Sequence, residues 1–149
     1  MANISLKQYI KRRTGVPLGH SNSLKNMLYR SLGAKSFAQF WCYWNPIWSY
    51  YLAYYVQRPC TKVLSKPVAI FITFSVSGAL HDVAISLLKL KPIFFFTPWF
   101  AVMGIVVIFT SKFEMTVTSK KWGLRACANI TLIITSYLLT DYIITKSFI

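Results

Sequence analysis

Three stretches of the chain are apolar for long enough to cross a lipid bilayer. They are residues 68–88, 93–111 and 126–145, and each is about 20 residues long. At a rise of about 1.5 Å per helical residue, each stretch matches a hydrocarbon core of roughly 30 Å. Few ionisable groups interrupt them, namely His81 and Asp82 in the first stretch and one acid near the end of the third. The pattern predicts an all-α integral membrane protein with three transmembrane helices.

A fourth stretch, residues 37–57, is equally long but differs in composition, because Phe, Trp and Tyr dominate it. Trp and Tyr favour the membrane–water interface, where the ring and its polar atom are both satisfied. Pro46 interrupts any continuous helix, and Asn45 is suited to cap a helix that starts at this proline. We therefore expect an interfacial or re-entrant helical segment here and not a fourth span.

The first 36 residues are basic, and part of them has the pattern of an amphipathic helix. The Ser-Asn-Ser run at 21–23 can cap this helix, Gly33 can end it, and its apolar positions fall on one face: Leu24, Met27, Leu28 and Leu32. Such a helix lies on a membrane surface or packs against its own protein, and both alternatives stay open. Residues 7–19 are expected to be a basic connection. We divide the chain into a juxtamembrane segment, residues 1–36, and a membrane domain, residues 37–149.

Composition and charge also indicate a membrane protein. The 149 residues carry a net charge of +14, from 17 Lys and Arg against 3 Asp and Glu, and 55% of them are hydrophobic. This combination argues against a cytosolic globular enzyme, a disordered basic tail and a nucleic-acid-binding domain. If the aromatic stretch does not cross, the loops on its side carry 14 cations and the opposite loops 3, whereas a crossing gives 10 and 7. The positive-inside rule favours the first topology, with a cytoplasmic N-terminus beside anionic lipids and an outward C-terminus.

Targeting signals and cysteines narrow the interpretation further. Basic residues occupy the place where the apolar core of a signal peptide would lie, so we expect internal helices to drive insertion. The sequence has no eukaryotic retention signal, which favours a bacterial inner membrane. Cys42, Cys60 and Cys127 have no metal-site spacing and are odd in number, so we expect small apolar residues and no metal site.

His81 is the main anomaly, because an ionisable group within a span is costly and is a functional candidate by default. Thr73, Ser77 and His81 follow one another at intervals of four residues, so their side chains form a polar stripe on one helical face. Hydrogen bonding between helices would explain the stripe as well as a function would. Gly78 lets another backbone approach. Asp82 points about 100° away from its neighbour, so we expect it to find a cation or a donor elsewhere.

Asn45, inside the aromatic run, and Arg58, at its end, each have two possible roles. The Asn45 amide could cap a helix or could supply hydrogen bonds to a substrate carbonyl. Arg58 could bind lipid phosphate or could anchor an anionic substrate.

At these residues the sequence resembles the membrane-bound O-acyltransferases. The run KSFAQFWCYWNPIWSYYLAYYVQRP, residues 35–59, is similar to the FW-x-x-W-[HN] stretch of that family. The later segment SVSGALHDV, residues 75–83, is similar to the S-G-x-x-H segment that carries the family's intramembrane histidine. The order of the two motifs, their separation and the membrane context all agree with the family.

The resemblance implies transfer of an acyl group from an acyl-CoA or acyl-carrier thioester to a hydroxyl of a lipid, glycan or peptide, with no further cofactor. It makes His81 the general base and Asn45 the donor that positions the substrate. The candidates for substrate binding are Trp44, Ser77, Arg58 and Asp82. Because family members are longer, the chain resembles a short variant of their C-terminal catalytic portion. Four alternatives stay open for such a variant: it forms a homo-oligomer, it acts with a partner membrane subunit, it is a reduced form of the enzyme, or it has lost activity.

Two other functions fit the residues. A non-catalytic membrane subunit could scaffold a larger cell-envelope enzyme, which three spans with open polar faces would allow. A proton- or ion-conducting subunit would use His81 and Asp82, but no second intramembrane acid–base group continues a relay.

Overall fold

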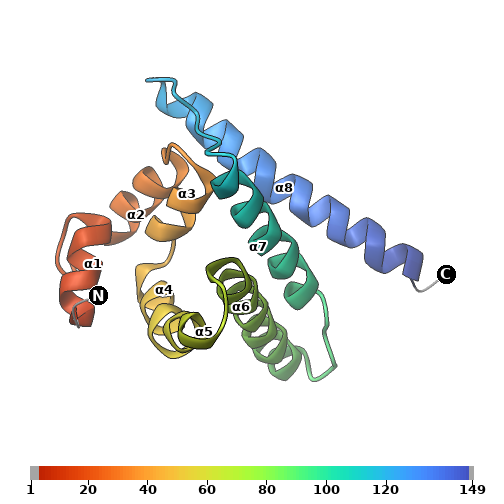
Figure 1. Ribbon diagram of the computed structural model, residues 1–149. Helices are drawn as coiled ribbons and strands as arrows, with labels where there is room; N and C mark the ends of the chain where they lie inside the picture. Colours follow the sequence, from red (N-terminus) through yellow and green to blue (C-terminus); the bar gives the residue numbers. More distant parts are fainter. Residues whose placement is uncertain (1–3, 148–149) are drawn as a thin grey trace.

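The chain folds into helices joined by short connections (Figure 1). The computed structural model describes residues 4–147, and the helices in that range are α1 (Leu6–Thr14), α2 (Ser23–Leu32), α3 (Phe37–Tyr43), α4 (Pro46–Leu52), the π-helical stretch η1 (Ala53–Gln57), α5 (Arg58–Val63), α6 (Lys66–Lys89), α7 (Phe96–Lys112) and α8 (Trp122–Ser147). No strand occurs among these residues, so the predicted all-α fold is confirmed.

Two of the helices, α6 and α8, are long and apolar enough to cross a membrane, and they contain the predicted stretches 68–88 and 126–145. The predicted stretch 93–111 forms α7, which is also apolar but has 17 residues and begins at Phe96. At about 1.5 Å per residue, α7 is about 25 Å long, slightly less than a hydrocarbon core of roughly 30 Å. Length and composition therefore support two membrane helices, and the third span stays a prediction.

Helices α6 and α7 form an antiparallel pair with extensive contact, and α8 packs along α7 (Figure 1). The close approach of the pair depends on Gly78. A Cβ atom at this position would lie 2.7 Å from the Cα of Thr97 and would also meet the carbonyl oxygen of Phe96. The prediction that Gly78 lets another backbone approach is therefore confirmed.

The bundle has one strongly basic end. The N-terminal helices and the α7–α8 connection lie at this end, whereas the α6–α7 connection and the C-terminal end of α8 lie at the other (Figure 1). Of the 17 Lys and Arg, 14 belong to the first end, and the second end has Lys89, Lys91 and Lys146. The predicted membrane orientation rests on this asymmetry of charge.

The aromatic stretch 37–57 is divided into short helices, and its break lies at Asn45. This residue has a left-handed backbone with φ of +38°, which Asn tolerates better than most residues. Its Oδ1 accepts a hydrogen bond from the backbone N–H of Trp48 at 3.2 Å, and Pro46 is the first residue of α4. The predicted cap is confirmed, and the stretch does not form one membrane-length helix.

The main hydrophobic cluster lies where α3 meets α7. Phe37 and Phe40 are buried there with Ala34 and Val107, and half-buried side chains from α6 and α8 pack around them. The first aromatic residues of the stretch therefore form the core of the protein. The tyrosines farther along the stretch are exposed instead, as interfacial residues would be: Tyr51, Tyr54 and Tyr55.

Residues 7–19 were expected to be a basic connection, and this prediction is wrong because α1 lies there. Ser5 and Gln8 form a reciprocal capping box at its start, and Gly15 ends it with a φ of +82°. The Ser-x-x-Gln spacing and the glycine are both visible in the sequence. The high density of cations obscured the short apolar face that includes the buried Ile10.

Helix α2 has the predicted position and packs partly on its own protein. Nη1 of Arg30 donates to the carbonyl oxygens of Arg12 and Arg13 at 3.2 and 2.7 Å, so α2 caps the C-terminal end of α1. Leu32 packs against the hydrophobic cluster. The N-terminal half of α2 leaves an apolar surface that nothing in residues 4–147 covers, formed by Leu24 and Leu28.

The start of α8 is attached to the N-terminal helices by two polar side chains. Nδ2 of Asn129, which is 3% exposed, donates to the carbonyl oxygens of Leu32 and Ala34, both at 3.0 Å. The indole of Trp122 donates to the carbonyl oxygen of Tyr29 and stacks on its ring. Helix α2 thereby contacts both α3 and α8 across the division proposed after residue 36, and that division stays a prediction.

Candidate functional site

His81 lies in the second half of α6, half-buried among aromatic rings from two other helices. Its ring centroid lies 5.7 Å from that of Trp48 in α4, and the two planes are nearly perpendicular at 82°. On α7, the ring centroids of Phe96 and Phe100 lie 5.9 and 5.0 Å away. Rings from α4 and α7 therefore hold the imidazole between them.

One hydrogen bond determines the tautomer of His81. Its Nδ1 lies 2.6 Å from the carbonyl oxygen of Ser77, one turn earlier in α6. A carbonyl oxygen can only accept, so Nδ1 carries the proton, and in the neutral ring Nε2 carries the lone pair. Within the described residues Nε2 has no hydrogen-bond partner, and it is not among the fully buried unpartnered atoms. Nε2 is thus the nitrogen that can accept a proton from a ligand.

Ser77 also connects the site to α4. The indole Nε1 of Trp48 donates to Ser77 Oγ at 2.9 Å, and Ser77 is 4% exposed. This bond uses a lone pair of the hydroxyl, and the hydroxyl proton has no acceptor in the part of the chain that the structure describes. One member of the polar stripe, Ser77, therefore hydrogen-bonds to another helix, as one alternative predicted, whereas Thr73 and His81 bond to carbonyl oxygens of α6 itself. The stripe also leaves one donor, on Ser77, and one acceptor, on His81, within one turn.

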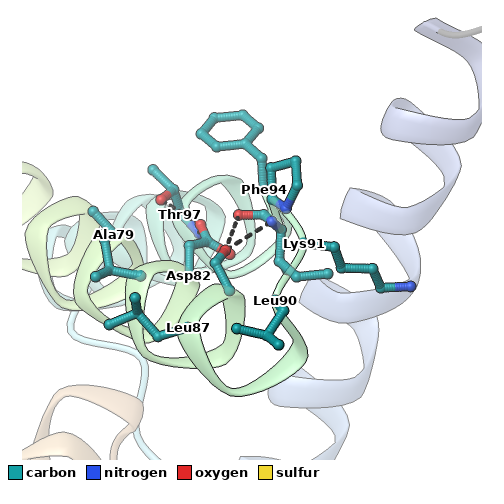
Figure 2. Close-up of a pocket in the computed structure, with 11 residues that line it drawn as sticks. Ala79, Asp82, Leu87, Leu90, Lys91, Phe94 and Thr97 are labelled. Atoms are coloured by element: carbon teal, nitrogen blue, oxygen red, sulfur yellow. Dashed lines mark hydrogen bonds between the residues drawn. The ribbon is translucent and has the colours of Figure 1, made fainter.

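Asp82 is directed towards the start of α7, where Thr97 lies beside it (Figure 2). Its Oδ1 accepts from the backbone N–H of Phe95 and Phe96 at 2.9 and 2.8 Å. Its Oδ2 accepts from the backbone N–H and the hydroxyl of Thr97 at 2.7 and 2.6 Å. The expectation that Asp82 finds donors elsewhere than on His81 is confirmed. Because both oxygens are occupied, this geometry does not support a proton relay through Asp82.

Asn45 reaches this site only through Trp48. The Asn45 side chain is exposed; its oxygen is taken by the Trp48 N–H, and its NH₂ group has no partner among residues 4–147. The amide therefore has two donors available to a ligand while it caps α4. No direct contact with His81 is present in the described chain.

The remaining predicted residues lie in other surroundings. Trp44 stacks on Phe40 at 5.5 Å and belongs to the hydrophobic cluster. The guanidinium of Arg58 lies over the ring of Tyr54, 5.6 Å from its centroid. The three cysteines are free thiols, and two of them are exposed rather than packed: Cys42 and Cys127.

The comparison with protein families identifies the chain. The model of the membrane-bound O-acyltransferase (MBOAT) family matches residues 14–144. The chain belongs to this family. The comparisons with curated proteins and with solved structures gave no match. Members of the MBOAT family are membrane-integral and act on acyl donors and hydroxyl acceptors, and the two long apolar helices fit this description.

The MBOAT chain also has a pocket of about 580 Å³, and it lies on the Asp82 side of α6 (Figure 2). His81 is not one of its lining residues. One face of α6 and the connection to α7 form its largely apolar wall, which includes Ala79, Val83, Leu87, Leu90, Ile93 and Phe94. Asp82 and Ser86 also line it, and both are hydrogen-bonded within the chain. The pocket is therefore separate from the surroundings of Nε2.

Three residues of the MBOAT site were not predicted from the sequence: Trp48, Phe96 and Phe100. A local signal was available for the first, because the third residue after a helix cap is the one that the cap contacts. Phe96 and Phe100 are four residues apart and share a face of α7. Their meeting with His81 depends on how α6 and α7 pack, which Gly78 marks but does not specify.

Proposed function

We propose that this MBOAT protein is an O-acyltransferase in which His81 is the general base. The observation that supports the proposal is the hydrogen bond from Nδ1 to the Ser77 carbonyl, because it leaves the lone pair on Nε2, beside aromatic rings and without a partner in the described residues. A general base must present an unprotonated nitrogen within hydrogen-bonding reach of the proton that it takes. Nε2 is the unprotonated nitrogen, and its position without a partner in the described residues leaves it free to accept a hydrogen bond from the substrate hydroxyl.

The reaction proceeds through one tetrahedral intermediate. The acceptor hydroxyl oxygen attacks the thioester carbonyl carbon while its proton passes to Nε2 of His81. The electron pair of the carbonyl bond moves to its oxygen, and the hydroxyl of Ser77 and the amide of Asn45 are the donors available to stabilise this oxyanion. The carbon–sulfur bond then breaks, and the thiolate takes the proton from Nε2. An ester and a free thiol are formed, His81 is neutral again, and no further cofactor takes part.

The substrates follow the family chemistry. The donor is an acyl-CoA or an acyl-carrier thioester, and the acceptor is a hydroxyl of a lipid, glycan or peptide. Arg58 is the candidate to bind an anionic group of the donor, since its guanidinium has a ring contact but no acidic partner in residues 4–147. Trp44 and Asp82 stay predicted substrate contacts, although each already has a packing or hydrogen-bonding role within the chain.

The proposed setting is a bacterial inner membrane with three spans, α6, α7 and α8. The basic end of the bundle faces the cytoplasm, where its cations contact anionic lipids, and the exposed tyrosines of the aromatic stretch lie at the interface. A homo-oligomer or a partner membrane subunit would complete the enclosure of the site.

The test is transfer of labelled acyl groups from acyl-CoA to a lipid extract by the purified protein in nanodiscs. We expect His81→Gln to lower turnover by at least about 100-fold, the usual effect of losing a general base. His20→Gln is the matched control, because His20 is exposed in the loop between α1 and α2. Wild-type turnover by His81→Gln would refute the assigned role.

A non-catalytic membrane subunit is the second candidate, and the exposed apolar side chains favour it. Leu87 and Leu88 of α6 are 71% and 80% exposed, and Leu138 of α8 is 59% exposed, so both helices have room for a partner. This candidate predicts a stable complex with a larger enzyme that forms equally well when His81 and Asn45 are both replaced. Loss of turnover without loss of the complex in that double variant would contradict it.

A further inference from the structure

We propose that Trp48 is a positioning residue of the acyl-transfer site, which fixes both Ser77 and His81 from a neighbouring helix. This inference rests on the proposed function of His81. It starts from two contacts of a single side chain, the 2.9 Å hydrogen bond from Nε1 to Ser77 Oγ and the perpendicular packing on the imidazole.

The hydrogen bond determines what Ser77 can offer. A serine hydroxyl in a helix commonly donates to the carbonyl one turn earlier, as Thr73 does here to Ala69 at 2.6 Å. Ser77 makes no such bond in the described chain and accepts from the indole instead. With an acceptor site occupied by Trp48, the hydroxyl proton remains available to a substrate oxygen. The indole thereby makes Ser77 a donor in the site.

The ring contact determines the direction of the imidazole. Trp48 packs against His81 nearly edge to face, and Phe100 packs on the same ring at 5.0 Å. Turning the imidazole about its Cβ–Cγ bond would change its packing on these two rings and would break the bond from Nδ1 to the Ser77 carbonyl. The two rings therefore favour the orientation in which Nε2 holds the lone pair.

Trp48 is itself held by Asn45. The backbone N–H of Trp48 donates to Oδ1 of Asn45 at 3.2 Å, so the cap of α4 sets the start of the helix that carries the indole. The amide donor Asn45 and the imidazole base His81 of the proposed reaction are thus connected through one tryptophan. Part of the effect of replacing Asn45 is expected to arise through Trp48.

Trp48→Phe tests the proposal, because phenylalanine keeps an aromatic ring but lacks the N–H donor. The matched control is Trp122→Phe, which removes an indole bond of the same 2.9 Å length between the start of α8 and α2. We expect kcat of Trp48→Phe to fall about tenfold, the effect of one neutral hydrogen bond, with KM changed less than twofold. Ser77→Ala removes the same bond from the other side and should lower kcat at least as much. Adding Trp48→Phe to Ser77→Ala should then cost less than it costs in the wild-type chain.

A second measurement does not depend on turnover. The chain has two histidines, His20 and His81, so ¹⁵N-imidazole spectra of the protein in lipid contain two ring systems, and His20→Gln assigns them. We expect a single Nδ1–H tautomer for His81 in the wild type, in Trp122→Phe and in Trp48→Phe, which keeps a ring beside the imidazole, and a mixture of tautomers in Trp48→Leu, which removes that ring.

The two measurements distinguish a failure of the role of Trp48 from a failure of the proposed function of His81. An unchanged His81 spectrum in Trp48→Leu, or a kcat of Trp48→Phe no lower than that of Trp122→Phe, would overturn the role of Trp48. If His81→Gln keeps full turnover while the tautomer still shifts in Trp48→Leu, the proposed function fails and the positioning contact stands. If the Trp48 variants do not fold, Ser77→Ala decides the case by kcat alone, because it removes the same hydrogen bond, and a wild-type kcat in Ser77→Ala would overturn the proposal.

Discussion

Replacing Asp82 by asparagine tests how the structure joins its two central helices. The carboxylate accepts four hydrogen bonds from Phe95, Phe96 and Thr97, and Asp82 is 5% exposed. Asparagine keeps one oxygen and turns an NH₂ group towards the donors that faced the other oxygen. Two of the four bonds are therefore lost, and the two donors that had bonded to the replaced oxygen now face the NH₂ group, which is itself a donor.

The magnitude follows from the kind of bond that is lost. A hydrogen bond to a charged group contributes about 1.5–3 kcal/mol, whereas polar side-chain bonds between membrane helices average about 0.6 kcal/mol. The Asp82 bonds are charged, and they lie at the N-terminal end of α7, where the helix dipole favours a negative group. We therefore expect Asp82→Asn to lower the free energy of unfolding by about 2–5 kcal/mol.

The assay is equilibrium unfolding of the purified protein by SDS in mixed micelles, followed by tryptophan fluorescence. Thr97→Val is the control, because it removes the hydroxyl bond alone and leaves the carboxylate with three backbone donors. We expect it to cost about 1–2 kcal/mol. An unfolding free energy for Asp82→Asn that is within 1 kcal/mol of the wild type, or above that of Thr97→Val, would refute the anchoring role. A raised KM with unchanged stability would instead support the predicted substrate contact.

Three further predictions follow from the packing and the charges. Gly78→Ala forces the backbone at the start of α7 away from α6 and should lower the free energy of unfolding by about 1–3 kcal/mol in the same assay. Gly123→Ala is the control, because Gly123 has open space around it, and it should cost less than about 1 kcal/mol. Equal effects of the two substitutions would contradict the close approach of α6 and α7. Asn129→Ala removes the bonds that attach α8 to the N-terminal helices and should lower stability by about 1–3 kcal/mol, and an unchanged midpoint would argue against this attachment. With the native cysteines replaced by serine, Lys25→Cys and Lys91→Cys should react with a membrane-impermeant maleimide from opposite sides of oriented membranes, and reaction from the same side would reject the proposed orientation.

The sequence predicted the features whose signals are local. Apolar runs of membrane length located α6 and α8, and the Asn45–Pro46 pair predicted the break in the aromatic stretch. Gly78 in a polar stripe predicted a close approach of two backbones. Each of these inferences needs only a few neighbouring residues, because caps, breaks and helix length are properties of a short segment.

The features that were missed depend on contacts between distant segments. The direction of Asp82 could be predicted from helix geometry, but its donors lie in a connection whose path no periodicity sets. Phe37 was assigned to the interface by its composition, and it is buried because α3 packs on α7. Arg30 lies off the apolar face of the predicted amphipathic helix, and it caps α1 because α2 folds back onto that helix.

His81 combines both kinds of information. In a regular helix the Ser77 carbonyl accepts the backbone N–H of His81, so the imidazole must use the second lone pair of the same oxygen. The four-residue spacing makes that bond possible and is readable from the sequence. Whether the ring turns towards the carbonyl depends on Trp48 and Phe100, which come from other helices. The sequence therefore identifies the base, while the tertiary contacts determine which of its two nitrogens is available to take a proton.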